Sequence, residues 1–341
     1  MTNLKDAPLK DLETRGFVLV PSFLSAAEAG LCREEFERQP VAAENRNYNL
    51  SPVTGRAHET IVERVKEVLA AVEAATDLRP DLPMGGSFFA TRRGIKFSWH
   101  QDHESFFTIQ NHYDYLNFYI PIVKPRKDKS NLCIIPFDVL QKENPRIHER
   151  VVRAGAANYV RVRKRTLVFH DDTGKLSLMG GDLDRLAYAP ELEAGDLLLL
   201  RGDIIHRTQD ADTERVALSF RVARAGALVR RSRLADGGLT KAWMMMNDAR
   251  TYERIFQAFD LKGQETMGYE EMLKTMDSLP PSESMGRKRF FRYLLSQKRR
   301  EGVLLRFLRR SVSTVFVAMI ATVLMPRRRA SPPSPPPRAP A

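Results

Sequence analysis

The pattern of apolar and polar positions near the N-terminus predicts one short strand and two helices. The apolar run Phe17 to Val20 is typical of a β-strand. Ser25 is followed three residues later by Glu28, a spacing at which the two side chains cap the first turn of a helix. From Glu59 to Thr76 apolar residues recur at helical spacing, which indicates an amphipathic helix.

From Gly85 to about Arg224 the pattern changes to short strands. Apolar runs such as YLNFYIPIV, NLCIIPF and RVALSFRVA are separated by Gly, Pro, Asp and Asn. No helix long enough for the crossovers of a parallel sheet is predicted between them, so an antiparallel sandwich or barrel is expected. After Gly238 the pattern is helical again, and the chain ends in the Pro-rich stretch RRRASPPSPPPRAP.

These changes predict a mainly β fold with flanking helices and a helical C-terminal extension. We divide the chain into a β domain at residues 1–235, a helical extension at 236–286, and a basic tail at 287–341 that holds an apolar segment and the Pro-rich end. A length of 341 residues with 43% apolar residues is enough for a sizeable core.

The net charge of +12 is unevenly distributed. From Arg287 onward there are fourteen Lys and Arg against one acid, Glu301, so the rest of the chain sums to about −1. A nucleic-acid partner is therefore not expected for the β domain. The two cysteines cannot form a disulfide framework and the N-terminus has no secretory pattern, so a cytoplasmic location is expected.

The stretch FSWHQDHESFF at residues 97–107 carries the candidate chemistry. His100 and Asp102 stand two residues apart at the end of a predicted strand, where side chains at i and i+2 point to the same side. They can be buried polar residues, an acid/base pair, or two ligands of a metal. His206 ends a later apolar strand and supplies a third ligand, and two His with one carboxylate form the facial triad of non-haem Fe(II) oxygenases.

Two further His-x-Asp pairs begin at His112 and His170, so position must discriminate among them. His170 lies only 36 residues before His206, which is too short for the intervening strands of a barrel. His112 lies in the polar turn QNHYDY rather than at a strand end. His100, 106 residues before His206, is therefore the favoured first ligand.

Five motifs occur in order over roughly residues 14–224. They are GFVLVPSFLSAAE, WHQD, NLCIIPF, EAGDLLLLRGDIIH and RVALSFR. In these motifs the chain resembles the phytanoyl-CoA dioxygenase-like Fe(II)/2-oxoglutarate oxygenases. It departs from the family pattern in two places, because only nine residues separate His206 from Arg215 and because the Pro of NLCIIPF is not followed by Gly-Ser-His.

The resemblance implies a double-stranded β-helix, or jelly roll, that uses Fe(II), 2-oxoglutarate and O2. His100, Asp102 and His206 would be the metal ligands and the centre of catalysis. The implied reaction converts 2-oxoglutarate and O2 to succinate and CO2 while hydroxylating a small organic substrate. Related halogenases have Gly or Ala in place of the carboxylate, so Asp102 favours hydroxylation.

The far carboxylate of 2-oxoglutarate needs a fixed cation, which a guanidinium can provide in bidentate form. Arg215, Ser219 and Arg221 share one face of the predicted strand RVALSFRV, so either arginine can point inward. The family pattern places Arg215 on 2-oxoglutarate. Lys96, Asn117 and Tyr119 are further candidates for this binding site.

Two C-terminal segments have more than one interpretation. FDLKGQETMGYEEM at residues 259–272 resembles a calcium-binding EF-hand loop, but Lys262, Gln264 and Glu265 replace two ligands and the turn glycine, which favours a packing role. SVSTVFVAMIATVLM at residues 311–325 would span about 22 Å as a helix, short of a bilayer core. It can anchor at an anionic membrane surface or dock on the β domain.

An alternative to the oxygenase is a catalytically inactive β-barrel that acts as a membrane-tethered binding or scaffold module. The complete set of metal ligands argues against this alternative.

Overall fold

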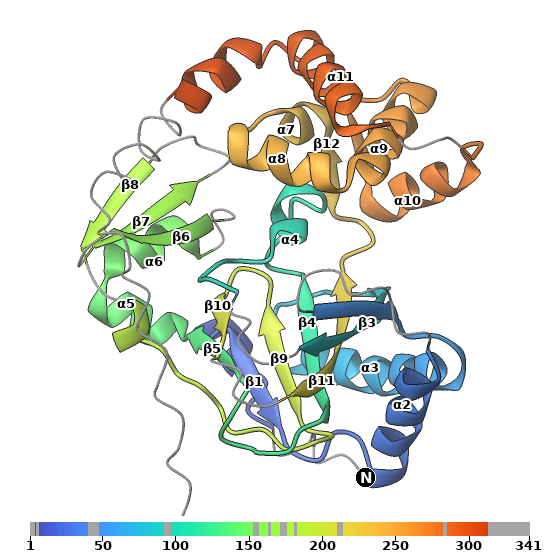
Figure 1. The fold of residues 1–341 in the computed structure, drawn as a ribbon, viewed down its shortest axis with the longest axis vertical. Helices are drawn as coiled ribbons and strands as arrows, with labels where there is room; N and C mark the ends of the chain where they lie inside the picture. The colour runs from blue at the N-terminus through green and yellow to red at the C-terminus, as the bar shows by residue number, and fades with distance from the viewer. Residues whose placement is uncertain are drawn as a thin grey trace, which may run out of the picture.

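The structure, a computed structural model, describes residues 4, 7–39, 48–91, 97–152, 157–162, 165–170, 176–180, 183–209, 214–281 and 285–312. These residues form a body built around β-sheets and a helical part that lies over one end of that body (Figure 1).

A six-stranded antiparallel sheet forms the centre of the body. In sheet order its strands are β1 (Phe17–Val20), β9 (Leu197–Arg201), β4 (Leu116–Val123), β11 (Arg215–Ala223), β3 (Leu82–Thr91) and β2 (Tyr48–Pro52). The register of β11 shifts against β3 after Arg221 and against β4 after Val216. The pairing of β11 with both of its neighbouring strands is therefore irregular at one point each.

A narrow second sheet lies against the inner face of the large one. It consists of β5 (Leu132–Ile135) and β10 (Ile205–Thr208), with single bridges from Ile134 to Tyr188 and from His206 to His100 at its two sides. Ile134 and Leu132 share a buried cluster with Leu198 and Ala217 of the large sheet. Two antiparallel sheets around one core are consistent with the expected double-stranded β-helix.

The segment between β5 and β9 forms a separate antiparallel sheet with short helices (Figure 1). Its elements are α5 (Phe137–Glu143), α6 (Pro145–Val151), β6 (Ala157–Val162), β7 (Arg165–His170), β8 (Leu176–Gly180) and the 3-10 helix η2 (Leu183–Arg185).

Alternation along β11 separates two cores. Val216, Leu218 and Phe220 lie on the face of the large sheet that the helices cover, and they pack against the apolar stripe of the long helix there. Ala217 points inward, between the sheets. The covering helices are α1 (Asp11–Thr14), α2 (Ala26–Arg38) and α3 (Gly55–Ala75), and the stripe of α3 consists of Ala57, Ile61, Val65, Val68 and Val72.

The C-terminal helices pack onto the body through a second core. Tyr115 and Ala223 of the body lie in one buried cluster with Phe256, Met272 and Phe290 of the helical part. The elements of the helical part are β12 (Leu228–Arg230), α7 (Arg231–Ala235), α8 (Leu239–Asn247), α9 (Ala249–Lys262), β13 (Thr266–Gly268), α10 (Tyr269–Ser278) and α11 (Arg287–Arg300). The short helix α4 (His103–Phe107) contacts α8 through a separate cluster of Phe106, Phe107 and Met244. Because this core is continuous, the division of the chain at residues 235 and 236 stays a prediction.

The N-terminal elements agree with the sequence pattern. The strand Phe17–Val20 is present, and Ser25 and Glu28 form both bonds of the predicted cap, at 3.3 Å from the Glu28 amide and 2.7 Å from the Ser25 amide. α3 begins at Gly55, one turn before the expected start.

The prediction of a mainly β fold is wrong in its proportions, because the fold is mixed. The C-terminal helices are a packed part of the structure rather than an appendage, and α5 and α6 interrupt the strand region. The segment after Gly238, where the pattern is helical, begins with two helices, α8 and α9, because the backbone at Asp248 leaves the helical conformation.

The loop that resembles an EF-hand is used for packing and ion pairs. Asp260, at its first position, forms ion pairs with Arg231 at 3.0 Å and Arg300 at 2.6 Å. Met267 is buried in β13, which pairs with β12. A carboxylate that already has two arginine partners is a poor calcium ligand.

The predicted apolar segment at residues 311–325 lies outside the described residues from Ser313 onward. Among the residues that are described, no helix combines the length and apolar character needed to cross a membrane.

Candidate metal centre

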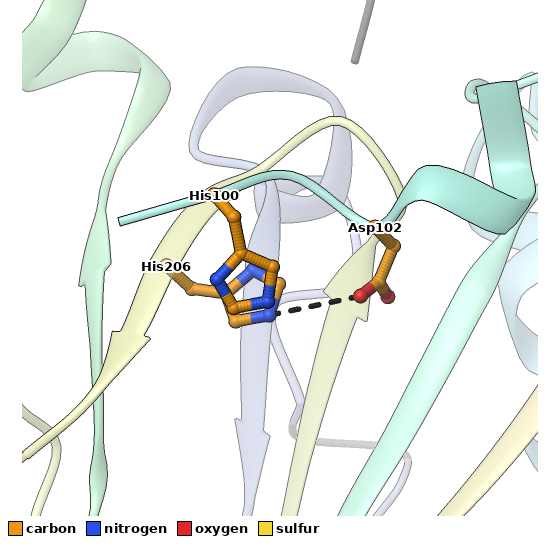
Figure 2. A group of neighbouring side chains, drawn as sticks. All are labelled: His100, Asp102 and His206. Carbon is orange, nitrogen blue, oxygen red and sulfur yellow. Dashed lines mark ion pairs between the residues drawn. The ribbon is translucent and has the colours of Figure 1, made fainter. Parts of the chain in front are cut away.

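His100, Asp102 and His206 converge at one point, as Figure 2 shows. The backbones of the two histidines bond each other in both directions at 2.9 Å, and their ring centroids are 4.3 Å apart. Asp102 follows at the N-terminal boundary of α4, in extended conformation. One ligand atom from each of the three residues lies within 4.8 Å of the others, so all three can reach a single ion.

The predicted strand at His100 is reduced to this single bridge. The chain pairs with β10 only at His206 and then enters α4 at His103. The backbone between His100 and Asp102 is nevertheless extended enough that both side chains face the same point, as the i, i+2 spacing predicted.

Backbone carbonyls fix the orientation of both imidazoles. Nδ1 of His100 lies 2.7 Å from the carbonyl of Ser98, and Nδ1 of His206 lies 3.1 Å from the carbonyl of Ile204. Because a carbonyl only accepts, each Nδ1 carries the proton and each Nε2 keeps a free lone pair. This is the tautomer that a metal-binding histidine needs.

The protonation states also suit a cation. Burial, together with the nearby His206, lowers the pKa of His100 to about 3, so its imidazole is neutral at physiological pH. Burial opposes ionisation of Asp102, but His206 and Arg221 hold the pKa of its carboxyl below its usual value. One carboxylate, the neutral imidazole of His100 and the imidazole of His206 form a donor set for a divalent metal.

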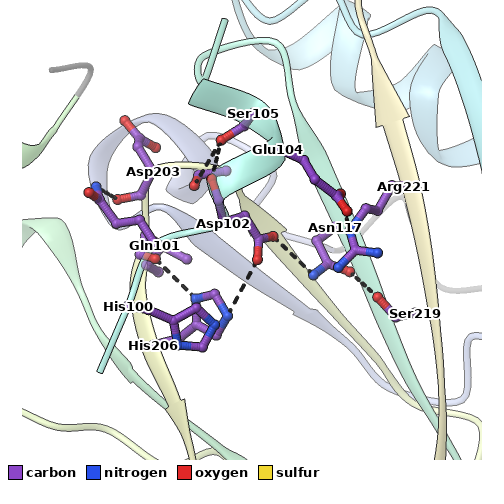
Figure 3. A network of polar contacts seen from close by, with 12 residues as sticks. His100, Gln101, Asp102, Glu104, Ser105, Asn117, Asp203, His206, Ser219 and Arg221 are labelled. Carbon is purple, nitrogen blue, oxygen red and sulfur yellow. Dashed lines mark hydrogen bonds and ion pairs between the residues drawn. The ribbon is translucent and has the colours of Figure 1, made fainter. Parts of the chain in front are cut away.

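Asn117 and Ser219 hold the carboxylate in place. The Asn117 amide donates to Oδ2 of Asp102 at 3.3 Å and accepts from the Ser219 hydroxyl at 3.0 Å (Figure 3). The other oxygen, Oδ1, faces Nε2 of His206 at 3.7 Å. Asn117 and Ser219 were predicted to bind 2-oxoglutarate. In the structure they lie beside the carboxylate of Asp102 instead, where they orient it.

Gln101 links the two ligand loops and was not found from the sequence. Its side chain is fully buried and donates to the carbonyls of Asp203 at 2.6 Å and Val151 at 2.9 Å. Asp203 belongs to the turn that leads to His206, and Arg201 grips its carboxylate with two bonds at 2.9 and 2.6 Å. Its position between His100 and Asp102 could have identified Gln101 from the sequence, because a residue between two side chains on one side of an extended segment points to the other side.

The two candidate arginines share the inner face of β11 but lie in different surroundings. Arg221 forms an ion pair with Glu104 at 3.2 Å, and Tyr115 donates to the same carboxylate at 2.9 Å. Its side chain is partly exposed and lies on the Asn117 side of Asp102 (Figure 3).

Arg215 is almost fully buried, at 2% exposure. Its guanidinium donates to the backbone carbonyls of Ser130 and Asn131 and lies 5.8 Å from the ring centre of Tyr119. Its Nε and the Tyr119 hydroxyl are buried with no hydrogen-bond partner among the described residues, and none of these residues forms an ion pair with Arg215. A buried guanidinium of this kind can bind an anion.

Lys124 adds a second cation beside Arg215. Burial and the neighbouring Arg215 lower the pKa of its ammonium to about 7. No sequence pattern singles out Lys124, because a lysine at the end of a strand is usually exposed to solvent.

Of the other two His-x-Asp pairs, the one at His112 has a different role, and the one at His170 is not described at the level of side chains. His112 is buried and bonds the Ser105 hydroxyl at 2.7 Å, while Asp114 pairs with Arg224 at 3.2 Å. The side chain of His170 lies outside the described residues. The choice of His100 from its position is consistent with this geometry.

No family model and no curated protein matches the chain, whereas solved structures do. The non-heme alpha ketoglutarate dependent epimerase SnoN from nogalamycin biosynthesis matches with a TM-score of 0.43 and 12% identity, over 67% of this chain and 85% of that chain. A prolyl-4-hydroxylase from Pseudomonas putida matches with a TM-score of 0.42 and 15% identity, over 64% and 97% of the chains. HygX from Streptomyces hygroscopicus, with nickel and 2-oxoglutarate bound, has a TM-score of 0.42 and 16% identity, over 63% and 85%.

Among these proteins, SnoN is described as alpha ketoglutarate dependent and HygX was solved with 2-oxoglutarate bound. SnoN has also been solved in complex with Fe3+ and alpha ketoglutarate. Since every one of these TM-scores lies below 0.5, the assignment of function depends on the geometry of the site itself.

Proposed function

We propose that this chain is an Fe(II)- and 2-oxoglutarate-dependent oxygenase that hydroxylates a small organic molecule. The observation that carries the proposal is the convergence of His100, Asp102 and His206 with both imidazoles held in the metal-binding tautomer. A catalytically inactive barrel would have no need to orient two imidazoles and a carboxylate toward one point. The fold in this proposal is a jelly roll with a helical C-terminal part.

The donor set fits iron, with three positions left open by a facial arrangement of three protein ligands. When bound, the iron would supply the oxidative chemistry that couples decarboxylation of 2-oxoglutarate to insertion of one oxygen atom into a substrate C–H bond. Asn117 would keep Asp102 oriented toward the metal, and the carbonyls of Ser98 and Ile204 would keep the histidines in position.

Arg215 is the residue that we assign to the far carboxylate of 2-oxoglutarate. Asn131, whose carbonyl it contacts, is three residues from Ile134, the partner of His206 in the second sheet. Along a strand this separation is about 10 Å, which an extended five-carbon dicarboxylate can span when its other end lies at the metal. Tyr119 and Lys124 would complete the anion site with a hydroxyl and a second cation.

Arg221 does not fit this role equally well. It lies six residues further along β11, about 20 Å away on an extended strand, and Glu104 already balances its charge. One small carboxylate cannot be held by both arginines.

Anaerobic titration of the iron-loaded protein with 2-oxoglutarate tests the proposal. We expect a weak visible charge-transfer band, followed on admission of O2 by release of succinate. Asp102→Ala should lose iron and the band, while the matched variant Asp114→Ala, outside the site, should keep both. Wild-type protein that neither retains iron nor shows the band would support the scaffold alternative. Incorporation of labelled oxygen from O2 into product distinguishes hydroxylation from epimerisation or cyclisation.

A further inference from the structure

A short helix at residues 304–312 presents apolar side chains to solvent. Leu305, Leu308 and Val312 have exposed fractions of 78%, 49% and 71%. At about 100° per residue they lie within roughly 60° of arc, so they form one stripe along the helix. Large aliphatic side chains aligned in this way are unusual on a surface that contacts only water.

The opposite side fixes this helix to the protein. Val303 and Phe307 are buried in the C-terminal core, at 1% and 3% exposure. Arg310 forms an ion pair with Asp236 at 2.8 Å, and Arg306 lies 3.6 Å from the same carboxylate. The helix is therefore docked, and its stripe faces outward because the other face is already used.

The surroundings of the stripe are strongly basic. Residues 287–312 contain ten Lys and Arg and one acid, Glu301, whose carboxylate is engaged by Arg231. Arg309 is exposed on the same helix beside the stripe, and Arg289 and Arg292 are exposed on α11. Figure 1 shows α11 and the following helix at the edge of the molecule furthest from the large sheet.

We propose that Leu305, Leu308, Arg309 and Val312, together with the exposed cations of α11, form a docking surface for an anionic lipid bilayer. Apolar side chains can enter the interface between headgroups and acyl chains, while the arginines remain with the lipid phosphates and carboxylates. Nucleic acid would use the cations and leave the leucines in water. A second copy of the chain would bring two basic surfaces together, which like-charge repulsion opposes. This proposal is independent of the metal centre.

Vesicle sedimentation with the full chain tests the surface. The vesicles are phosphatidylcholine alone and phosphatidylcholine with about 30 mol% phosphatidylserine. The stripe variant is Leu305→Ser/Leu308→Ser/Val312→Ser, and the charge variant is Arg289→Glu/Arg292→Glu. The matched control is Leu228→Ser/Leu261→Ser, which replaces two equally exposed leucines elsewhere, at 62% and 63%.

We expect the wild-type chain and the control to bind the anionic vesicles and to ignore the neutral ones. The stripe variant and the charge variant should each bind at least tenfold more weakly, which is about 1.4 kcal/mol, with melting temperatures close to wild type. Equal binding of the stripe variant and the wild type overturns the proposal, because attachment would then depend on residues 313–341. A wild-type dimer that the stripe variant alone converts to monomer, or tight binding of duplex DNA with none to vesicles, assigns the surface to another partner.

Discussion

Replacing Arg215 by Ala should abolish tight binding of 2-oxoglutarate while leaving the metal site intact. Arg215 is a buried guanidinium with no carboxylate partner among the described residues, so it is already desolvated before the co-substrate arrives. Removing one partner of a buried, hydrogen-bonded charge pair costs about 2 to 5 kcal/mol. This predicts a dissociation constant for 2-oxoglutarate that is raised roughly thirtyfold to several thousandfold.

The assay is an anaerobic titration of 2-oxoglutarate into iron-loaded protein, followed by the visible band, with iron content measured in parallel. Arg215 also donates to the carbonyls of Ser130 and Asn131, so its loss should cost about 1 to 3 kcal/mol of stability. Arg215→Lys, which keeps a cation, separates this structural cost from loss of the anion site and should bind the co-substrate better than the alanine variant. The melting temperature of each variant provides the necessary check.

Arg221→Ala is the matched control, because the two arginines share one strand face. It should change the dissociation constant for 2-oxoglutarate by less than about threefold, since Glu104 and not the co-substrate is its partner. If Arg221→Ala instead prevents saturation while Arg215→Ala titrates normally, the assignment of the anion site is refuted.

Three further predictions follow from the same geometry. Gln101→Leu should weaken Fe(II) or Co(II) binding by about 10- to 100-fold, because the Gln101 amide no longer joins the segment of His100 and Asp102 to the turn before His206. Metal titration of the variant checks this, and an unchanged affinity contradicts it. The pKa of the Lys124 ammonium is about 7 in the free protein, and an incoming anion favours its charged form, so 2-oxoglutarate affinity should fall as pH rises above 7, by up to about tenfold per pH unit. Titrations of Lys124→Met between pH 6 and 8 should show no pH dependence of the affinity. A pH dependence as steep as that of the wild type would exclude Lys124 from the anion site. Millimolar calcium should change neither melting temperature nor activity, since Asp260 is held by Arg231 and Arg300; a calcium-dependent rise in melting temperature would show a working site.

Removing the basic tail from residue 303 onward would be a poor test of the docking surface. A cut at residue 303 would remove Val303 and Phe307, which are buried in the C-terminal core. Exposed apolar core residues would then destabilise the protein, so loss of lipid binding in such a variant would be uninformative. Substitutions on the exposed stripe avoid this difficulty.

Local periodicity predicted the apolar faces of a helix and a strand, but not the single bridge at His100. The apolar stripe of α3 and the alternation along β11 follow directly from spacing, because a helix and a strand each put fixed positions on one face. The three candidate ligands follow from the same spacing, as His100 and Asp102 are two apart and His206 ends an apolar strand, and they lie close enough together to hold a metal ion.

The proportions of the fold could not be predicted in this way. The pattern after Gly238 was correctly helical, but nothing in it indicated that Phe256 and Phe290 share a core with Tyr115. Burial of that kind depends on which apolar faces meet. The apolar face of an amphipathic helix can pack on the body or on a neighbouring helix, and the spacing of apolar residues is the same in both cases.

The sequence by itself therefore determined the ligand types, their spacing and the strand face that holds both arginines. Only the tertiary structure decided which arginine is buried without a carboxylate, that Asn117 serves Asp102, and that Gln101 reaches Asp203 from 102 residues away. The physical reason is that periodicity fixes directions within one element, whereas partners are set by the register between strands, by the shifts in β11, and by turns that bring distant segments together.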